Sequence, residues 1–158
     1  MRDSGAARNH DDHDDVAPQR STPSRWHSGR LPRLVRVLIA DDSADARELY
    51  ALFLTHQGFN VKLASDGVEA VDAATTLKPD IIVMDLSMPR MDGITATQRL
   101  KAQPRTRHIP VILLTGYPHK AIEKGALEAG VDVFLTKPCL PEDLEGHVRQ
   151  LLEGKANR

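Results

Sequence analysis

The sequence predicts an α/β fold in which one five-stranded parallel sheet is covered by helices on both faces. Short apolar segments alternate with longer segments whose apolar residues recur at helical spacing, and this alternation repeats five times between residues 34 and 152. Alternation of this kind is typical of parallel sheets, whose strands are connected through helices. The strand candidates are mainly apolar, and the third is almost wholly so, which indicates a parallel sheet covered on both faces and therefore a doubly wound sheet with five helices.

The first two strand–helix pairs have clear limits. Residues 34–40 (LVRVLIA) are an apolar run typical of a strand, and residues 43–57 carry apolar side chains at helical spacing. Gly58 ends this helix, because glycine readily adopts the left-handed conformation that often follows a helix. A second strand over residues 59–64 and a second helix over residues 67–77 follow.

The next two pairs repeat this pattern. Residues 80–84 (DIIVM) predict the third strand, and a loop with proline and glycine leads to a helix over residues 94–102. Residues 110–114 (PVILL) predict the fourth strand. The fourth helix covers residues 120–129 and ends at Gly130.

The last pair and the two ends set the limits of the domain. Residues 131–135 (VDVFL) predict the fifth strand and residues 141–152 the last helix, which has proline in its first turn. We therefore expect one domain over residues 34–153, followed by a short C-terminal tail over residues 154–158. Residues 1–33 contain few aliphatic side chains and are rich in Asp, Arg, Ser, Pro and His, so we expect a disordered N-terminal tail.

Charge and composition argue against several functions. The formal net charge is −1, so no broad basic field favours direct binding to nucleic acid. No segment approaches the roughly 18 apolar residues of a membrane-spanning helix, so we expect no membrane insertion. The one cysteine, Cys139, cannot form an internal disulfide, and a reducing, cytoplasmic location is the expectation.

Polar residues occur where the predicted strands end. The residues that follow strands one, three, four and five are, in that order, Asp41 and Asp42, Asp85, Thr115 and Gly116, and Lys137 and Pro138. The carboxyl ends of parallel strands lie at one edge of a doubly wound sheet, which is where such folds bind their ligands. We therefore expect these side chains to lie close together.

The charges of this group predict a chemistry. Three carboxylates in one place repel one another, and a hard divalent cation such as Mg²⁺ relieves this repulsion because it prefers oxygen ligands. Asp85, at the end of a central strand, is placed to attack a phosphoryl group. Lys137 and the cation would neutralise charge on the phosphoryl oxygens, and Thr115 would donate a hydrogen bond to one of them.

Four motifs in the order of the chain carry a resemblance to a known family. They are VLIADDS (37–43), IIVMDLSMPRMDG (81–93), VILLTG (111–116) and VFLTKP (133–138). With them, the chain from residue 34 to 153 resembles a response regulator receiver domain of the single-domain, chemotaxis-regulator type. The resemblance implies a flavodoxin-like sheet with the strand order 2-1-3-4-5.

The resemblance also implies roles for the acidic residues. Asp85 is the phosphoacceptor and contributes to the metal site. Asp42 binds Mg²⁺ directly, whereas Asp41 acts mainly through water. Ser87 contributes its backbone carbonyl to the metal.

The remaining strand-end residues receive roles in phosphate binding and switching. Thr115, Gly116 and Lys137 bind the phosphoryl group, and the peptide bond between Lys137 and Pro138 is expected to be cis. Thr115 and the aromatic residue Phe134 form the switch, whose two states differ on the face built from helix four, strand five and helix five.

The implied function is that of a stand-alone response regulator. A sensor histidine kinase or a histidine phosphotransfer protein would supply the phosphoryl group, and a downstream protein would bind the phosphorylated form. We expect no enzymatic activity beyond catalysis of the protein's own phosphorylation and dephosphorylation.

Three alternative functions compete with this interpretation. A phosphohydrolase of the haloacid-dehalogenase type needs a second aspartate two residues after the nucleophile, where this chain has Ser87. A nucleotide-binding loop is not formed, because Val131 and Asp132 follow Gly130 where Lys and Ser or Thr are required. A receiver-like interaction module that is not phosphorylated stays open as the alternative, because the sequence identifies no kinase.

Overall fold

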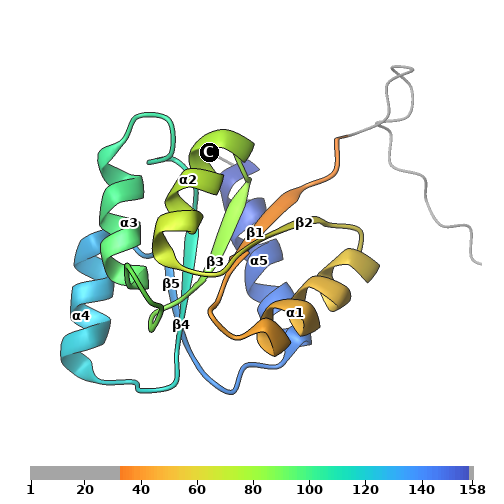
Figure 1. The fold of residues 1–158 in the computed structure, drawn as a ribbon. Helices are drawn as coiled ribbons and strands as arrows, with labels where there is room; N and C mark the ends of the chain where they lie inside the picture. Colours follow the sequence, from red (N-terminus) through yellow and green to blue (C-terminus); the bar gives the residue numbers. More distant parts are fainter. Residues whose placement is uncertain (1–32, 157–158) are drawn as a thin grey trace, which may run out of the picture. The chain divides into compact units, whose positions relative to one another are not determined.

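The computed structural model describes residues 33–156 and contains the expected parallel sheet (Figure 1). Its five strands lie in the order β2-β1-β3-β4-β5, and every neighbouring pair is parallel. The strands are β1 (Arg36–Ala40), β2 (Asn60–Ala64), β3 (Ile81–Asp85), β4 (Val111–Thr115) and β5 (Val133–Thr136). The predicted flavodoxin-like sheet is therefore confirmed. The N-terminal tail predicted over residues 1–33 lies outside the described residues, apart from Arg33.

Helices cover both faces of the sheet, with α1 and α5 on one face and α2, α3 and α4 on the other (Figure 1). They are α1 (Ala44–His56), α2 (Gly67–Leu77), α3 (Gly93–Ala102), α4 (Lys120–Ala129) and α5 (Pro141–Ala156). Among the described residues, no helix is both long enough and apolar enough to cross a membrane.

The sheet separates two hydrophobic cores, because successive side chains of a strand point to opposite faces. In β1, Leu38 and Ala40 belong to the core beneath α2, α3 and α4, whereas Val37 and Ile39 belong to the core beneath α1 and α5. All residues of β3 and β4 are buried. These central strands therefore give the residues at their carboxyl ends a fixed position.

The observed elements differ from the predicted ones mainly at their ends. The fifth strand begins at Val133 instead of residue 131, because the Val131 amide donates to the Ala126 carbonyl at the end of α4. Helix α5 continues to Ala156, so residues 154–156 of the predicted C-terminal tail are helical. Lys155 in the last turn favours this extension, since a cation stabilises the carboxyl end of a helix.

Candidate functional site

The carboxyl ends of the strands lie at the lower edge of the sheet in Figure 1, where loops lead to α1, α4 and α5. Asp41 directly follows β1, and Asp85 and Thr115 are the last residues of β3 and β4. Lys137 follows β5. The register of the sheet thus brings residues that are far apart in the sequence to one site.

Three aspartates and one lysine meet at this site. Asp41, Asp42 and Asp85 each offer one carboxylate oxygen, and these oxygens lie within 4.8 Å of one another. Lys137 Nζ donates to Asp41 Oδ2 at 3.1 Å and lies 3.3 Å from Asp85 Oδ1. We call these four residues the acidic pocket, because three negative charges face one positive charge.

The residues of the acidic pocket differ in exposure and in partners. Asp41 and Asp85 are buried, whereas Asp42 is exposed. The second carboxylate oxygen of Asp41, Oδ1, accepts a hydrogen bond of 2.9 Å from the Ser43 amide, so both of its oxygens have protein partners. The expected role of Asp41, which is to act on the metal mainly through water, stays a prediction.

The pKa values of two groups reflect these surroundings. Burial raises the pKa of Asp85 above its usual range, and the negative charge of Asp41 raises it further, although Lys137 opposes this. Burial lowers the pKa of Lys137, but its hydrogen bonds and charge interactions with Asp41 and Asp85 outweigh this effect and hold the pKa above its usual value. Lys137 therefore stays protonated at neutral pH.

The donor set fits a magnesium ion. It consists of hard carboxylate oxygens, it carries excess negative charge, and the exposed Asp42 keeps it open to water. Ser87, whose carbonyl is the further expected ligand, lies in the loop between β3 and α3, two residues after Asp85. This loop borders the acidic pocket, because it begins directly after Asp85.

The predicted phosphate-binding and switch residues lie on β4 and β5 or directly after them: Thr115 ends β4, Gly116 follows it, and Phe134 lies within β5. Thr115 is buried, and its Oγ1 accepts a hydrogen bond of 3.1 Å from the Tyr117 amide, while Gly116 is exposed. Phe134 is half-buried and packs against the core beneath α2, α3 and α4. The Lys137–Pro138 peptide bond is cis, as the resemblance implies.

Other residues near the site were not predicted from the sequence. The Tyr50 hydroxyl on α1 donates a hydrogen bond of 2.8 Å to the Cys139 carbonyl and thereby fixes the loop that carries Lys137. The helical spacing of residues 43–57 gave no sign of a polar partner for Tyr50. Asp66 and Arg90 form an ion pair at the loop between β3 and α3, and no pattern in the sequence indicated it.

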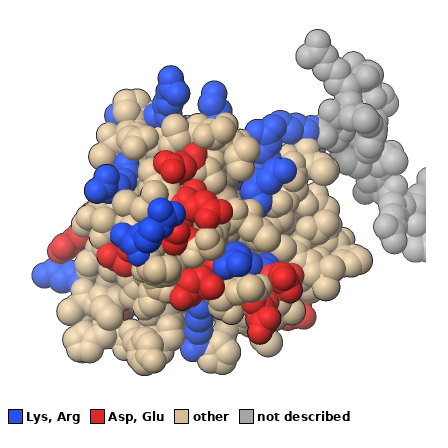
Figure 2. All heavy atoms as spheres, viewed as in Figure 1, with Lys and Arg blue, Asp and Glu red and all other residues tan. Residues whose placement is uncertain are grey.

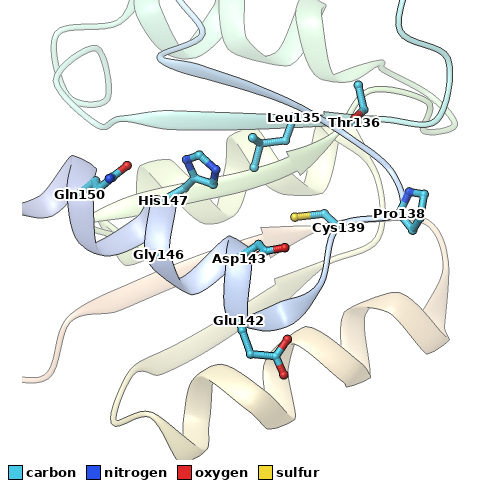
Figure 3. Close-up of a pocket in the computed structure, with 9 residues that line it drawn as sticks. All are labelled: Leu135, Thr136, Pro138, Cys139, Glu142, Asp143, Gly146, His147 and Gln150. Atoms are coloured by element: carbon cyan, nitrogen blue, oxygen red, sulfur yellow. The ribbon is translucent and has the colours of Figure 1, made fainter.

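A separate pocket lies beside the acidic one, between β5 and α5 (Figure 3). Its lining includes Leu135 on the strand, Cys139 in the loop, and Asp143 and His147 on the helix. Cys139 is half-buried and is a free thiol. Burial raises the pKa of this thiol, so it is protonated at neutral pH and weakly nucleophilic.

The fold together with this site defines a class of protein. A doubly wound sheet with three aspartates, a threonine and a lysine at its strand ends is the arrangement of receiver domains in two-component signalling. The comparison with known families agrees, since the model of the response regulator receiver domain matches residues 37–149. The chain therefore belongs to the response regulator receiver domain family.

Curated relatives show the same family over part of their length. The DNA-binding dual master transcriptional regulator RpaA of Synechocystis sp. is 38% identical over 117 residues, which are 74% of this chain and 48% of RpaA. Response regulator MprA of Mycobacterium tuberculosis is 36% identical over 118 residues, which are 75% of this chain and 50% of MprA. This chain thus spans about half the length of these relatives.

Solved structures agree with the fold. The chemotaxis protein CheY4 of Vibrio cholerae is 28% identical with a TM-score of 0.71, over 75% of this chain and 98% of CheY4. A receiver domain of a histidine kinase from Syntrophus aciditrophicus is 39% identical with a TM-score of 0.71, over 76% of this chain and 91% of that domain. A CheY-like receiver domain from Methanospirillum hungatei has a TM-score of 0.75 at 23% identity, over 79% and 98% of the two chains, and supports the fold alone.

Proposed function

We propose that this receiver domain accepts a phosphoryl group on Asp85 from a sensor histidine kinase or a histidine phosphotransfer protein, with Mg²⁺ held in the acidic pocket. One observation carries the proposal. The buried carboxylate of Asp85 lies 3.3 Å from a lysine ammonium and within 4.8 Å of two further carboxylates, of which Asp42 is exposed. Asp85 is thus a nucleophile with a charged partner and an open side.

The reaction follows from these positions. An oxygen of Asp85 attacks the phosphorus atom, a phosphorus–oxygen bond forms, and the phosphorus–nitrogen bond to the partner's histidine breaks. Lys137 pairs with the new negative charge, since its ammonium already lies against Asp85. When bound, Mg²⁺ supplies further positive charge for the phosphoryl oxygens, and Asp42 and the Ser87 carbonyl would hold it.

Switching would follow from the position of Thr115. Its hydroxyl now accepts from the Tyr117 amide, and a phosphoryl group on Asp85 would attract this hydroxyl as a donor. Phe134 lies on the neighbouring strand, where Leu113 of β4 is its partner in the register. We propose that Phe134 moves together with Thr115, that this changes the face of α4, β5 and α5, and that a downstream protein binds the changed face.

A groove next to the acidic pocket supports a protein as the phosphodonor. Leu49 of α1 and Leu140 of the loop before α5 are 55% and 61% exposed, and they line a hollow that reaches Lys137. Exposed leucines beside a reactive carboxylate fit the apolar face of a partner helix. On the face shown in Figure 2, acidic and basic side chains are interspersed, which favours a protein partner over direct binding to nucleic acid.

Acetyl phosphate with Mg²⁺, followed by intact mass spectrometry, tests the central claim. We expect one phosphoryl adduct on the parent protein, none on Asp85→Asn, and little on Asp42→Asn. Asp45→Asn is the matched control, because Asp45 is an exposed aspartate in the first turn of α1, outside the acidic pocket. An unmodified parent would instead favour the alternative function, an interaction module that is not phosphorylated.

Three further expectations remain part of this proposal. They are a stand-alone regulator, no enzymatic output beyond its own phosphorylation and dephosphorylation, and a cytoplasmic location. RpaA is described as a DNA-binding regulator, and this chain spans only about half of its length. The mass of the native protein, isolated from its source, tests the stand-alone expectation directly.

A further inference from the structure

Asp66 and Arg90 join the start of α2 to the loop that follows β3, and we call this ion pair the clamp. Arg90 Nε donates to Asp66 Oδ2 at 2.8 Å, and Arg90 Nη2 lies 2.8 Å from the same oxygen. The other oxygen, Oδ1, accepts a hydrogen bond of 2.8 Å from the Glu69 amide and so caps α2. One nearly buried carboxylate therefore both begins a helix and holds a loop.

A second contact keeps the same loop against α2. Gly67 is buried, and a Cβ atom there would overlap the Met91 backbone carbonyl, so the loop backbone lies directly on the first turn of the helix. Arg90 has a φ of 66°, in the left-handed region that is uncommon for residues other than glycine. Such a conformation persists where the surroundings compensate for its cost, and the clamp provides this compensation.

The base of the loop is fixed to the sheet. The Leu86 amide donates to a β4 carbonyl at 2.8 Å, and the Gly93 amide donates to the Leu86 carbonyl at 2.8 Å. A Cβ atom at Gly93 would overlap the backbone carbonyl of Asp85. Ser87 therefore lies in a short loop whose base is anchored next to Asp85 and whose tip, at Arg90, is held by the clamp.

We propose that the clamp positions this loop so that the Ser87 carbonyl faces the divalent cation, which makes Asp66 and Arg90 positioning residues for the phosphorylation of Asp85. The inference rests on the proposed function. The planar guanidinium of Arg90 meets Asp66 Oδ2 through a hydrogen bond from Nε and a charge contact from Nη2, and two such contacts fix direction as well as distance. A lysine, with a single ammonium, would fix distance alone. The clamp thus sets the orientation of the loop between β3 and α3 and not merely its distance from α2.

The clamp is tested with Asp66→Asn, Arg90→Met and the double variant. Asparagine caps helices as well as aspartate does, so Asp66→Asn removes the ion pair and keeps the cap. Asp92→Asn is the matched control, because Asp92 caps α3 at the end of the same loop, where its Oδ1 accepts a hydrogen bond of 2.8 Å from the Thr95 amide. The Mg²⁺ dissociation constant of the unphosphorylated full chain is measured by calorimetry, and hydrogen exchange of the loop amides is measured without metal.

We expect each single variant to bind Mg²⁺ about tenfold more weakly, as is typical when a group that orients a metal ligand is lost. The double variant should bind no more weakly than either single one, because all three break the same clamp. Loop amides should exchange faster in these variants and at the parent rate in Asp92→Asn. At saturating Mg²⁺, phosphorylation by acetyl phosphate should return to the parent rate, and Arg90→Lys should restore part of the affinity.

The outcomes separate the two proposals. A parent protein that binds no Mg²⁺ overturns the proposed function and this inference with it. A parent that binds Mg²⁺, with clamp variants of unchanged affinity, overturns the clamp alone. Should Asp66→Asn fail to fold, Arg90→Met carries the test, because the Arg90 side chain is 61% exposed and its loss leaves no buried cavity.

Discussion

Replacing Asp85, the proposed phosphoacceptor, should stabilise the protein in the absence of metal. At a separation of 4.8 Å, two unit charges repel by about 3.5 kcal/mol at an effective dielectric constant of about 20. Asp85 faces two such carboxylates, for a total of about 7 kcal/mol, whereas its attraction to Lys137 at 3.3 Å is about 5 kcal/mol. Burial adds a desolvation cost to the charged form of Asp85, whereas solvent around the exposed Asp42 weakens the repulsion. We therefore expect Asp85→Asn to raise the free energy of unfolding by about 1–2 kcal/mol.

The gain should depend on pH, because the pKa of Asp85 is raised in the folded protein. Between the usual pKa of 3.8 and the raised value, the folded state holds more protons than the unfolded state. The free energy of unfolding of the parent therefore falls as pH rises through this interval, and Asp85→Asn lacks this contribution. The stability difference should be small near the bottom of the interval and complete above it.

Thermal unfolding followed by circular dichroism, with EDTA present, measures both effects. In a domain of this size, the gain corresponds to a rise in Tm of about 4–8 °C. Mg²⁺ should then raise the Tm of the parent more than that of the variant, since only the parent has the third carboxylate. A variant less stable than the parent in EDTA, or an equal response of both to Mg²⁺, would refute the electrostatic reasoning.

Three further predictions concern packing and chemistry. Tyr50→Phe leaves a loop carbonyl without its donor and should lower the free energy of unfolding by about 1–2 kcal/mol in urea titration; an unchanged midpoint contradicts this. Gly67→Ala should cost at least about 2 kcal/mol, because the added methyl meets loop backbone, whereas Gly146→Ala, exposed in α5, should gain about 0.5–1 kcal/mol; equal effects would show that the loop moves away freely. Lys137→Met should slow phosphorylation by acetyl phosphate about 10²–10³-fold at saturating Mg²⁺, and parent-like kinetics would remove Lys137 from the reaction.

The fold followed from the sequence because its signals are local. Apolar runs such as the one ending at Asp85, and glycines after helices, depend on a few neighbouring residues. The convergence of Asp41, Asp85 and Lys137 also followed, since parallel strands place their carboxyl ends at one edge. Topology supplied the long-range information that the sequence pattern lacks.

The clamp and the polar partner of Tyr50 did not follow from the sequence. Arg90 pairs with Asp66, which precedes it by 24 positions, and a charged loop residue is more often solvated than paired. The Tyr50 hydroxyl donates to a backbone carbonyl 89 positions away. Every residue has a backbone carbonyl, so the sequence does not indicate which one accepts this hydrogen bond. Contacts that depend on loop geometry therefore need coordinates.

The two ion pairs of Lys137 have a consequence for the sheet as a whole. Lys137 follows the edge strand β5, yet its ammonium contacts side chains at the ends of β1 and β3 and so passes over β4. The edge strand is therefore tied electrostatically to the centre of the sheet, independently of the ladder of backbone hydrogen bonds. A new negative charge at the end of β3 changes the attraction between Lys137 and the carboxylates, and this change acts directly on β5, to which Lys137 is attached.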